Sequence, residues 1–222
     1  MNKRVLAYIY MPVLFFISAY AIFTLLFLPY KETFDLFVSA VTMTEQAENT
    51  KITSIFNEKK QKEIKPVDNQ IPSTQIEYPS LGTEYGTVII DKFNVQARLI
   101  YGDSPEDLRV GVGQFNGSVF PGEAGTTLIG GHNTSDLAAL DGVTVNDTIT
   151  IKTSYDTYQY KITNKKVARF DDKSAIESLY KKSDNNQLIL YTCYPIDMIG
   201  LTDDRLFVYA ERVSGKMINS SI

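Results

Sequence analysis

The sequence predicts a mainly β protein: a closed barrel of about eight strands with a few short helices, preceded by one N-terminal transmembrane helix. Short runs rich in β-branched and aromatic residues recur from about Gly82 to Glu211, separated by turn residues. These runs do not alternate with long helical segments, which argues against a βαβ architecture and favours an antiparallel or mixed barrel. An uncharged apolar stretch occupies residues 5–30.

That apolar stretch is longer than the roughly 20 residues that cross the hydrocarbon core of a bilayer. Lys3 and Arg4 precede it, and residues 31–35 carry no positive excess, so we expect the N-terminus in the cytoplasm and the rest of the chain outside. The alternative is a cleaved signal peptide with its cleavage site at residues 19–21. Cleavage there would leave a long apolar remnant, so we favour an uncleaved anchor of a single-pass membrane protein.

The composition divides the chain into four segments. Residues 1–30 are the cytoplasmic tip and the membrane anchor, and residues 31–80 form an extracellular stalk, because they are polar, rich in Lys, Glu, Gln and Ser, and contain three prolines in their second half. Residues 81–214 form the barrel domain. Residues 215–222 are a C-terminal tail.

Hydrophobic alternation and turn residues locate the elements of the barrel domain. A short helix is expected in residues 103–111, with Asp103 or Ser104 as N-cap and Pro105 at the first helical position. A second helix is expected over residues 172–182. The expected strands are residues 85–91, 95–101, 126–131, 148–153, 157–163, 166–170, 187–192 and 205–211.

Charge and cysteine content exclude several classes of function. The chain has a net charge of −4, and the part outside the membrane is more acidic because Lys3 and Arg4 precede the anchor. An acidic domain argues against nucleic acid or anionic lipid as a partner. A single cysteine excludes an internal disulfide and a cysteine-based zinc site.

The only cysteine, Cys193, ends an apolar run that begins at residue 187. Because side chains alternate along a strand, Cys193 faces the opposite side from Thr192. We expect Cys193 to be the last residue of its strand, since Pro195 cannot extend the hydrogen-bonded ladder. The thiol is therefore expected at the rim of the barrel, where a ligand can reach it.

Two other residues of distinct chemistry also stand at predicted strand ends. Arg205 opens the strand that follows Cys193, and His132, the only histidine, follows the strand 126–131. Acyl transfer through a thioester needs such a set: a thiol nucleophile, an imidazole that moves protons and a cation that stabilises the oxyanion. Taken singly, each residue also has a structural interpretation, as a buried thiol, a hydrogen-bonded imidazole or a surface ion pair. Their shared position sets a Cys/His site beside these structural interpretations, and the position of the residues alone leaves both open.

These residues resemble the motifs of the sortases, the membrane-anchored cysteine transpeptidases of Gram-positive bacteria. TTLIGGHNT is similar to the family's strand that ends in Gly-His. LILYTC is similar to its Thr-Leu-x-Thr-Cys motif, with Ile189 in place of the leading Thr. DDRLFVYAE is similar to the arginine-bearing strand that follows. The spacing of the histidine, the cysteine and the arginine along the chain also agrees with that of the family. GVGQFNGSVFPGEAGTTLIGGH and TCYP are most similar to class D sortases.

The resemblance implies an eight-stranded barrel and a defined reaction. A sorting signal of the Leu-Pro-x-Thr-Gly (LPXTG) type is cleaved after the Thr through an acyl-enzyme on Cys193, and an amine of the cell wall, such as the cross-bridge of lipid II, then accepts the surface protein. By position, His132 is the general acid/base and Arg205 the residue that stabilises the oxyanion and positions substrate. Thr192 and Gly131 are expected to contact substrate.

Several alternatives remain open. No cofactor is expected. Class A sortases bind calcium through acidic loop residues, and the corresponding candidates here are Glu123, Asp171 and Asp172. We interpret these three acids as solvated loop charges. Residues 166–186 stand at the place of the family's substrate-recognition loop. A pilin-polymerising transpeptidase of class C type and a non-catalytic, membrane-tethered binding module are the competing functions.

Overall fold

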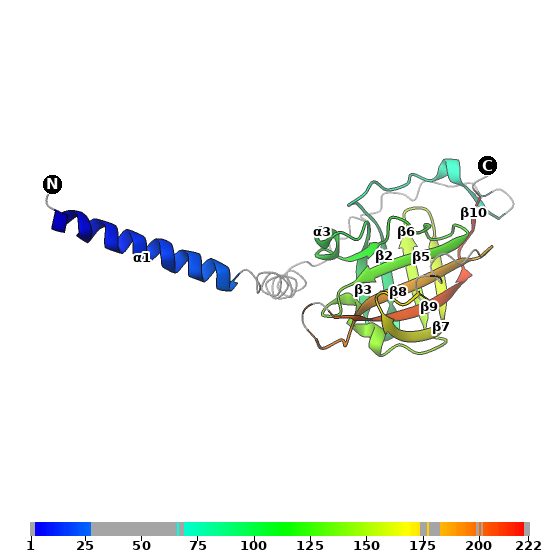
Figure 1. Cartoon of the computed structure of the whole chain (residues 1–222). Coiled ribbons are helices and arrows are strands. Elements are labelled where there is room, and N and C mark those ends of the chain that lie inside the picture. The colour runs from blue at the N-terminus through cyan, green and yellow to red at the C-terminus, as the bar shows by residue number, and fades with distance from the viewer. Residues whose placement is uncertain are drawn as a thin grey trace.

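The N-terminal segment of the protein is helical in the computed structural model, which describes residues 3–27, 66, 69–173, 177, 183–198, 200 and 202–219. Helix α1 spans Lys3–Phe27 and confirms the predicted N-terminal helix (Figure 1). Within the described residues, none of the helices combines the length and the apolar character needed to cross a membrane. Most of the predicted stalk, residues 31–65, 67 and 68, lies outside the described residues.

Eight strands close into a barrel in the order β2-β3-β4-β5-β8-β9-β7-β6, which confirms the predicted fold class (Figure 1). The pairs β3–β4 and β5–β8 are parallel and the other pairs are antiparallel, so the barrel is mixed. The strands are β2 (Glu84–Ile90), β3 (Val95–Tyr101), β4 (Val112–Gln114), β5 (Gly125–Gly131), β6 (Thr148–Thr153), β7 (Thr157–Arg169), β8 (Asn186–Tyr194) and β9 (Asp204–Ser214).

The structure differs from the prediction in three strands. The two runs predicted over residues 157–170 form the single strand β7, whose pairing register shifts between Ile162 and Asn164. Such an irregularity interrupts the alternation of inward and outward side chains, and the sequence therefore looks like two strands. Strand β4 was not predicted, since three residues are too few to show a period. Strand β8 continues past Cys193 to Tyr194.

One short α-helix confirms the helix predicted in residues 103–111, and the described residues also contain three short 3₁₀ helices. Helix α3 (Pro105–Leu108) begins after Ser104, whose Oγ accepts a hydrogen bond from the Asp107 N–H while Asp107 accepts one from the Ser104 N–H. This reciprocal cap satisfies two backbone donors at the start of the helix. The 3₁₀ turns are η2 (Ser73–Gln75), η3 (Asp91–Phe93) and η4 (Asp136–Asp141). The helix predicted over residues 172–182 lies almost entirely outside the described residues.

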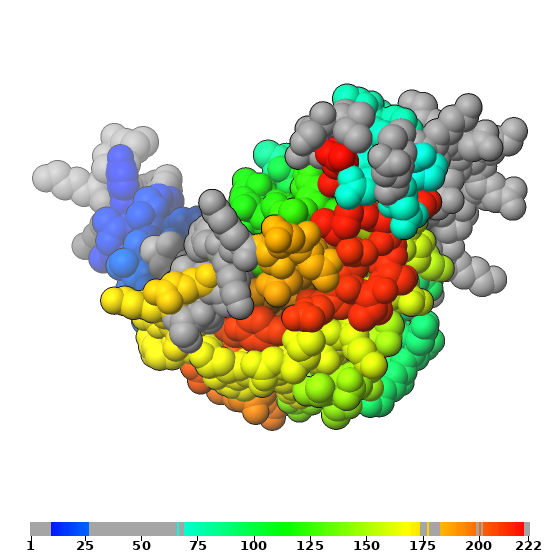
Figure 2. All heavy atoms as spheres, turned by 90° about the vertical axis from the view of Figure 1, so that its right-hand side faces the viewer, coloured from blue at the N-terminus to red at the C-terminus, as the bar shows by residue number. Residues whose placement is uncertain are grey.

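The strands around Cys193 carry apolar side chains on both faces. On β8, Leu188, Leu190 and Thr192 point into the main core. Ile189, on the opposite face, belongs to a second and smaller apolar cluster on the outside of the barrel, which we call the outer cluster. Strands β8 (orange), β9 (red) and β7 (yellow-green) lie side by side on the face seen in Figure 2. The buried members of the outer cluster are Leu128, Ala168, Ile189 and Phe207, and Phe115, Tyr191 and Tyr209 pack against them.

Residues on both sides of the predicted barrel domain are paired with each other. Strand β1 (Ile71–Pro72) lies parallel to β10 (Ile218–Asn219), and Figure 2 shows these segments in contact, in cyan and red. Strand β1 falls within the predicted stalk and β10 within the predicted tail. Strand pairing is therefore also present on both sides of the segment 81–214, whose boundaries stay a prediction.

A buried amide joins three strands near the end of the barrel where β8 begins. The Asn186 Oδ1 accepts hydrogen bonds from the Gly122 N–H at 3.2 Å and from the Tyr160 hydroxyl, and its Nδ2 donates to the Thr127 Oγ1 at 3.1 Å. Asn186 is fully buried. A buried polar group that loses its partner costs free energy, so this network holds the strand that carries Cys193 in register.

We predict that Asn186→Ala lowers the free energy of unfolding by about 2–5 kcal/mol, because three buried polar groups lose their partner. Urea unfolding followed by circular dichroism measures the change. Asn164→Ala, which removes an exposed amide from β7, is the matched control and is expected to stay within about 0.5 kcal/mol of the parent. Equal stability of the two variants would contradict the role given to the Asn186 network.

Candidate active site

One rim of the barrel collects the ends of three strands that carry the predicted site residues. Strands β5 and β8 run parallel, so both finish at this rim, and β9 runs antiparallel to β8, so it begins there. Since His132 follows β5, Cys193 lies near the end of β8 and Arg205 near the start of β9, the topology alone brings all three to the same edge.

The pairing register then aligns the three residues across neighbouring strands. Cys193 is the register partner of Arg205. Gly131 and Thr192 form the last pair between β5 and β8, and His132 and Cys193 are the residues that directly follow them in the sequence. Cys193 therefore stands between its register partner Arg205 on β9 and the end of β5, which His132 directly follows. Each of the three residues is partly exposed.

The guanidinium of Arg205 is held at one of its nitrogens. Its Nη1 donates to the carbonyl oxygens of Thr202 at 2.5 Å and Asp204 at 2.9 Å, and approaches the Thr202 Oγ1 at 3.3 Å. The Nε and Nη2 donors make no hydrogen bond to the described residues of the chain. Residues of the loop before β9 therefore fix the orientation of the Arg205 guanidinium through Nη1.

The environment of His132 favours its neutral form. Burial lowers the pKa of the His132 imidazole, and the nearby guanidinium of Arg109 lowers it further. Arg109 follows helix α3 and stands 23 residues before His132, so nothing in the sequence pattern linked the two. A neutral imidazole can accept a proton, which suits a general base.

Thr192 and Gly131 tie the two strands together just inside the rim. The Thr192 Oγ1 donates to the Gly131 carbonyl oxygen at 2.8 Å, and Thr192 is only 1% exposed. Its side chain points into the barrel, away from the outer face that Cys193 occupies. This geometry gives Thr192 a part in fixing β8 against β5, while the predicted substrate contacts of both residues stay predictions.

Tyr191, for which the sequence pattern indicates no role, lies on the outer face of β8, two residues before the thiol. A Cβ at Gly130 would lie 2.4 Å from the Tyr191 Cζ, so the ring crosses β5 where only a glycine leaves room. The ring also stacks on Phe207, with centroids 6.1 Å apart. Burial raises the pKa of the Tyr191 phenol, the carboxylate of Asp103 raises it further, and Arg205 partly opposes this rise. The phenol therefore stays a neutral hydrogen-bonding group near the site.

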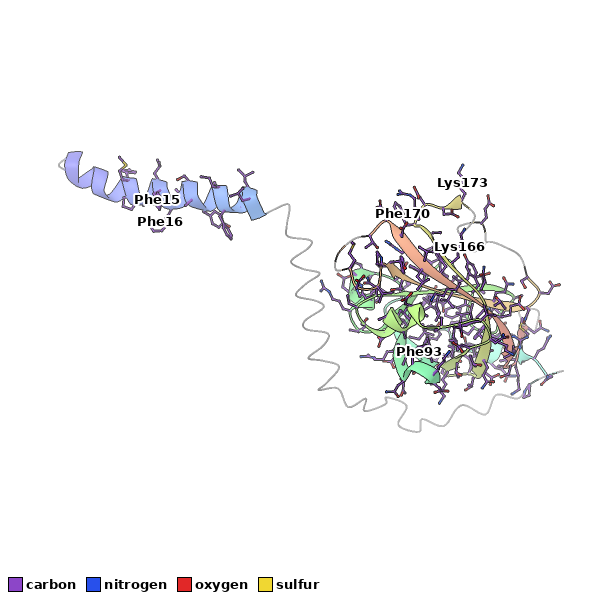
Figure 3. All side chains as sticks on the ribbon, turned by 90° about the horizontal axis from the view of Figure 1, so that it is seen from below. Phe15, Phe16, Phe93, Lys166, Phe170 and Lys173 are labelled. Atoms are coloured by element: carbon purple, nitrogen blue, oxygen red, sulfur yellow. The ribbon has the colours of Figure 1, made fainter. Side chains whose placement is uncertain are left out.

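The outer cluster leads along β8 to the thiol. Ile189, Tyr191 and Cys193 follow one another on the same face of the strand, so an apolar surface continues to the reactive sulfur. Phe170 adds an exposed aromatic ring just after β7, where Figure 3 labels it near Lys166 and Lys173. Part of the segment that stands at the place of the substrate-recognition loop, residues 174–176 and 178–182, lies outside the described residues.

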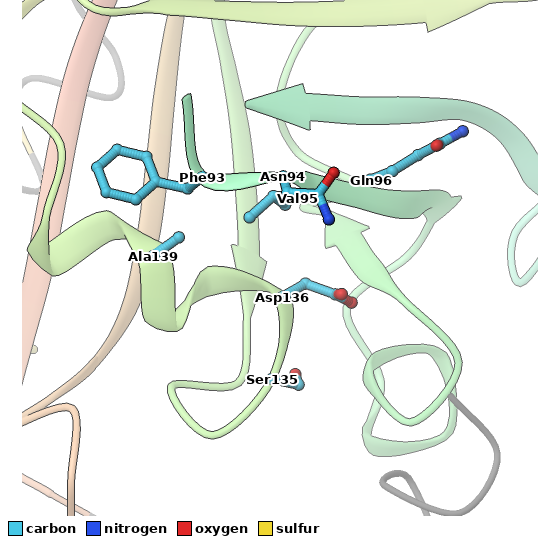
Figure 4. A pocket seen from close by; sticks show the side chains of 7 residues that line it. All are labelled: Phe93, Asn94, Val95, Gln96, Ser135, Asp136 and Ala139. Carbon is cyan, nitrogen blue, oxygen red and sulfur yellow. The ribbon is translucent and has the colours of Figure 1, made fainter. Parts of the chain in front are cut away.

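A cavity of about 530 Å³ opens on the same end of the barrel, because β3 begins where β5 ends. Figure 4 shows that η3 and β3 form one wall and η4 the other. Burial raises the pKa of the Asp136 carboxyl in this wall. The lining residues are Phe93, Asn94, Val95, Gln96, Ser135, Asp136 and Ala139.

The acids considered for calcium each have another partner. Glu123 accepts hydrogen bonds from the Tyr78 hydroxyl and the Phe120 N–H. Asp171 pairs with Arg169, and Asp172 lies 3.5 Å from the Lys166 ammonium. Over the described part of the chain, no three His, Cys, Asp or Glu residues gather where they could hold a metal ion. The absence of a calcium requirement stays a prediction.

The fold and the rim define a class of protein: a β-barrel with a thiol, an imidazole and a guanidinium on adjoining strand ends, a set suited to acyl transfer. The Sortase domain profile matches residues 88–213, more than half of the sequence. This chain therefore belongs to the sortase family, whose members are transpeptidases.

Individual relatives refine this assignment. Sortase D of Bacillus subtilis (strain 168) is 30% identical over 136 residues, which cover 61% of this chain and 67% of the relative. A solved Clostridium perfringens Sortase D5 transpeptidase is 26% identical, with a TM-score of 0.54 over 62% of this chain and 83% of that one. Sortase C1 of Streptococcus agalactiae is 25% identical, with a TM-score of 0.55 over 64% and 74%. The similarity to sortase D chains favours class D.

We predict that Arg109→Gln raises the pKa of His132, because a nearby positive charge disfavours the imidazolium and its removal relieves that cost. An NMR titration measures this directly, since the chain has a single histidine. The parent imidazole should titrate below the usual value near 6.5. The control is Lys152→Gln, which removes an exposed charge near the other end of the barrel; a shift as large in this variant would contradict the proximity argument.

Proposed function

We propose that this sortase cleaves an LPXTG-type sorting signal between Thr and Gly through a thioester on Cys193, and transfers the surface protein to an amine of the cell wall. The observation that supports the proposal is the meeting of three strand ends at one rim: Cys193 pairs with Arg205, and His132 follows Gly131, whose register partner is Thr192. In a family of transpeptidases, this is the set of groups that thioester chemistry requires.

In the acylation step, the Cys193 thiolate attacks the carbonyl carbon of the Thr residue and forms a C–S bond. The Nε and Nη2 donors of Arg205, which bond to none of the described residues, stabilise the negative charge that develops on the carbonyl oxygen. As the C–N bond breaks, the His132 imidazolium donates its proton to the leaving Gly amine. The products are a thioester on Cys193 and a neutral imidazole.

In the transfer step, the acceptor amine attacks the thioester carbonyl while His132 takes up its proton, and the C–S bond breaks to release the thiolate. The lowered pKa of His132 keeps this base in its neutral form at neutral pH. The same lowering makes the imidazolium that acylation requires scarce at neutral pH.

The outer cluster provides a surface for the sorting signal. The Leu and Pro of an LPXTG-type peptide are apolar, and Ile189 and Tyr191 offer an apolar path that ends at the thiol. The flat Tyr191 ring, held over Gly130 and against Phe207, suits contact with a proline. Shape and apolar contact on this face support a preference for a Leu-Pro-type motif.

The partners follow from this reaction. They are surface proteins with a C-terminal LPXTG-like signal and an amine acceptor such as the lipid II cross-bridge. We also propose that residues 5–30 anchor the chain as a single pass, with the barrel outside the cell membrane of a Gram-positive bacterium; this rests on the uncharged length of the segment. An anchor of this kind would hold the enzyme beside a lipid-linked acceptor.

A class C-type function, in which the acceptor is a pilin lysine, is the second candidate. It is favoured by the likeness to sortase C structures, such as Sortase C1 of GBS Pilus Island 1, which is 27% identical with a TM-score of 0.53. Offering the acyl-enzyme either a cross-bridge amine or a pilin lysine peptide separates the two. Faster transfer to the lysine peptide would favour the class C-type function.

We predict that incubation with a panel of LPXTG-like peptides adds the acyl fragment to Cys193, detected by mass spectrometry. Cys193→Ala abolishes the adduct, His132→Ala slows its formation by about 10²- to 10⁴-fold, and Arg205→Ala slows it by about 10²- to 10³-fold. Arg205→Lys recovers part of the rate, because a lysine keeps the charge and loses the planar fork.

The matched control is Arg212→Lys, at the other end of β9, where the side chain bonds to Asn185 and Gly215. It is expected to keep the parent rate. Labelling with a methanethiosulfonate tests the non-catalytic binding module: failure to label Cys193 in the native protein would favour that module. Transpeptidation by the Cys193→Ala protein would rule out the proposed mechanism.

A further inference from the structure

The side chain of Asn133 joins the two loops that leave the active-site rim. Asn133 directly follows His132 in the sequence and is only 6% exposed. Its Nδ2 donates to the Pro195 carbonyl oxygen at 2.9 Å and to the Met198 carbonyl oxygen at 3.0 Å. Both acceptors belong to the turn that begins two residues after Cys193.

These two hydrogen bonds use both N–H groups of the amide. The turn is itself closed by a hydrogen bond from the Met198 N–H to the Pro195 carbonyl oxygen at 3.3 Å. Asn133 therefore bonds to both ends of a closed turn, at Pro195 and at Met198. An aspartate of the same size would place an acceptor against two carbonyl oxygens, so the position requires the amide.

The two hydrogen bonds of Asn133 lie just beyond the point where the pairing of β5 with β8 ends. The last register pair between β5 and β8 is Gly131 with Thr192, so the ladder itself does not include His132 and Cys193. Past that pair, the bonds of Asn133 are the only hydrogen bonds that the described residues show between the loop after β5 and the turn after β8. These bonds join the segment that follows His132 to the turn that follows Cys193.

We propose that Asn133 is a positioning residue, which keeps His132 at proton-transfer distance from Cys193 by fastening the His132 loop to the turn after Cys193. The inference rests on the proposed function, because it assigns Asn133 a part in that thiol–imidazole chemistry. Proton transfer requires hydrogen-bond reach, and a displacement of about 1 Å in such a pair can lower a rate by about 10²-fold.

A double-mutant cycle with His132 tests this role. In the parent, Asn133→Ala should lower the rate of acyl-enzyme formation by about 10-fold or more while the KM for the peptide changes little, because the outer cluster is untouched. In a His132→Ala background, the same substitution should change the rate by less than about 2-fold, since no imidazole remains to be positioned. Asn133→Gln keeps both N–H donors and should recover part of the loss.

The cycle is run a second time with iodoacetamide, which alkylates Cys193 without any sorting peptide. This arm separates the inference from the proposed function: if no peptide acylates the enzyme, alkylation still reports whether the effect of Asn133 depends on His132. Alkylation of Asn133→Ala is expected to be slower than that of the parent, and the difference should vanish when His132 is absent.

The matched control is Asn185→Ala, which removes an amide bonded to the Arg212 carbonyl at the opposite end of β8. It is expected to lower the melting temperature without changing the alkylation rate of the folded protein. An equal fold-change for Asn133→Ala with and without His132, or a folded Asn133→Ala protein with the parent rates, would overturn the inference. Circular dichroism and thermal unfolding establish that each variant is folded.

Discussion

The structure depends on the pairing of β8 with a parallel strand on one side and an antiparallel strand on the other. Parallel pairing with β5 makes both strands finish at one rim, and antiparallel pairing with β9 makes the third strand begin there. The register then decides which residues meet, because a slip by one position would turn Cys193 into the barrel and Thr192 out of it. The buried Asn186 network and the bond between Thr192 and Gly131 hold that register at its two ends.

The chemistry of the rim follows from what each side chain meets there. Arg205 is fixed through one nitrogen by the carbonyl groups of its own loop, so its remaining donors are oriented before any ligand arrives. His132 is partly buried and lies near the guanidinium of Arg109, and both conditions favour the neutral imidazole over the imidazolium. A preoriented donor stabilises a developing charge without a reorganisation cost, and a neutral base is ready to take a proton. The barrel supplies both conditions through packing and hydrogen bonds.

Much of this arrangement could be predicted from the sequence. Alternation located seven of the eight barrel strands, and the capping residues located α3 with Pro105 at its first position. The strand ends at His132, Cys193 and Arg205 were visible because a lone histidine, a lone cysteine and an arginine each stand beside an apolar run. Strand β4 escaped prediction because it is too short to show a period, and β7 was divided because its irregular register breaks the alternation.

The site residues that the sequence did not reveal all act through space. Arg109 lowers the pKa of His132 from 23 residues earlier in the chain, Tyr191 fits over a glycine of the neighbouring strand, and Asn133 bonds to a turn more than sixty residues away. Local pattern determined that this chain makes short strands and which residues lie at their ends, because alternation and turn chemistry act between sequence neighbours. Only the tertiary structure decided that the ends meet and how the loops between them are fastened, because register and side-chain contacts join residues that the sequence keeps far apart.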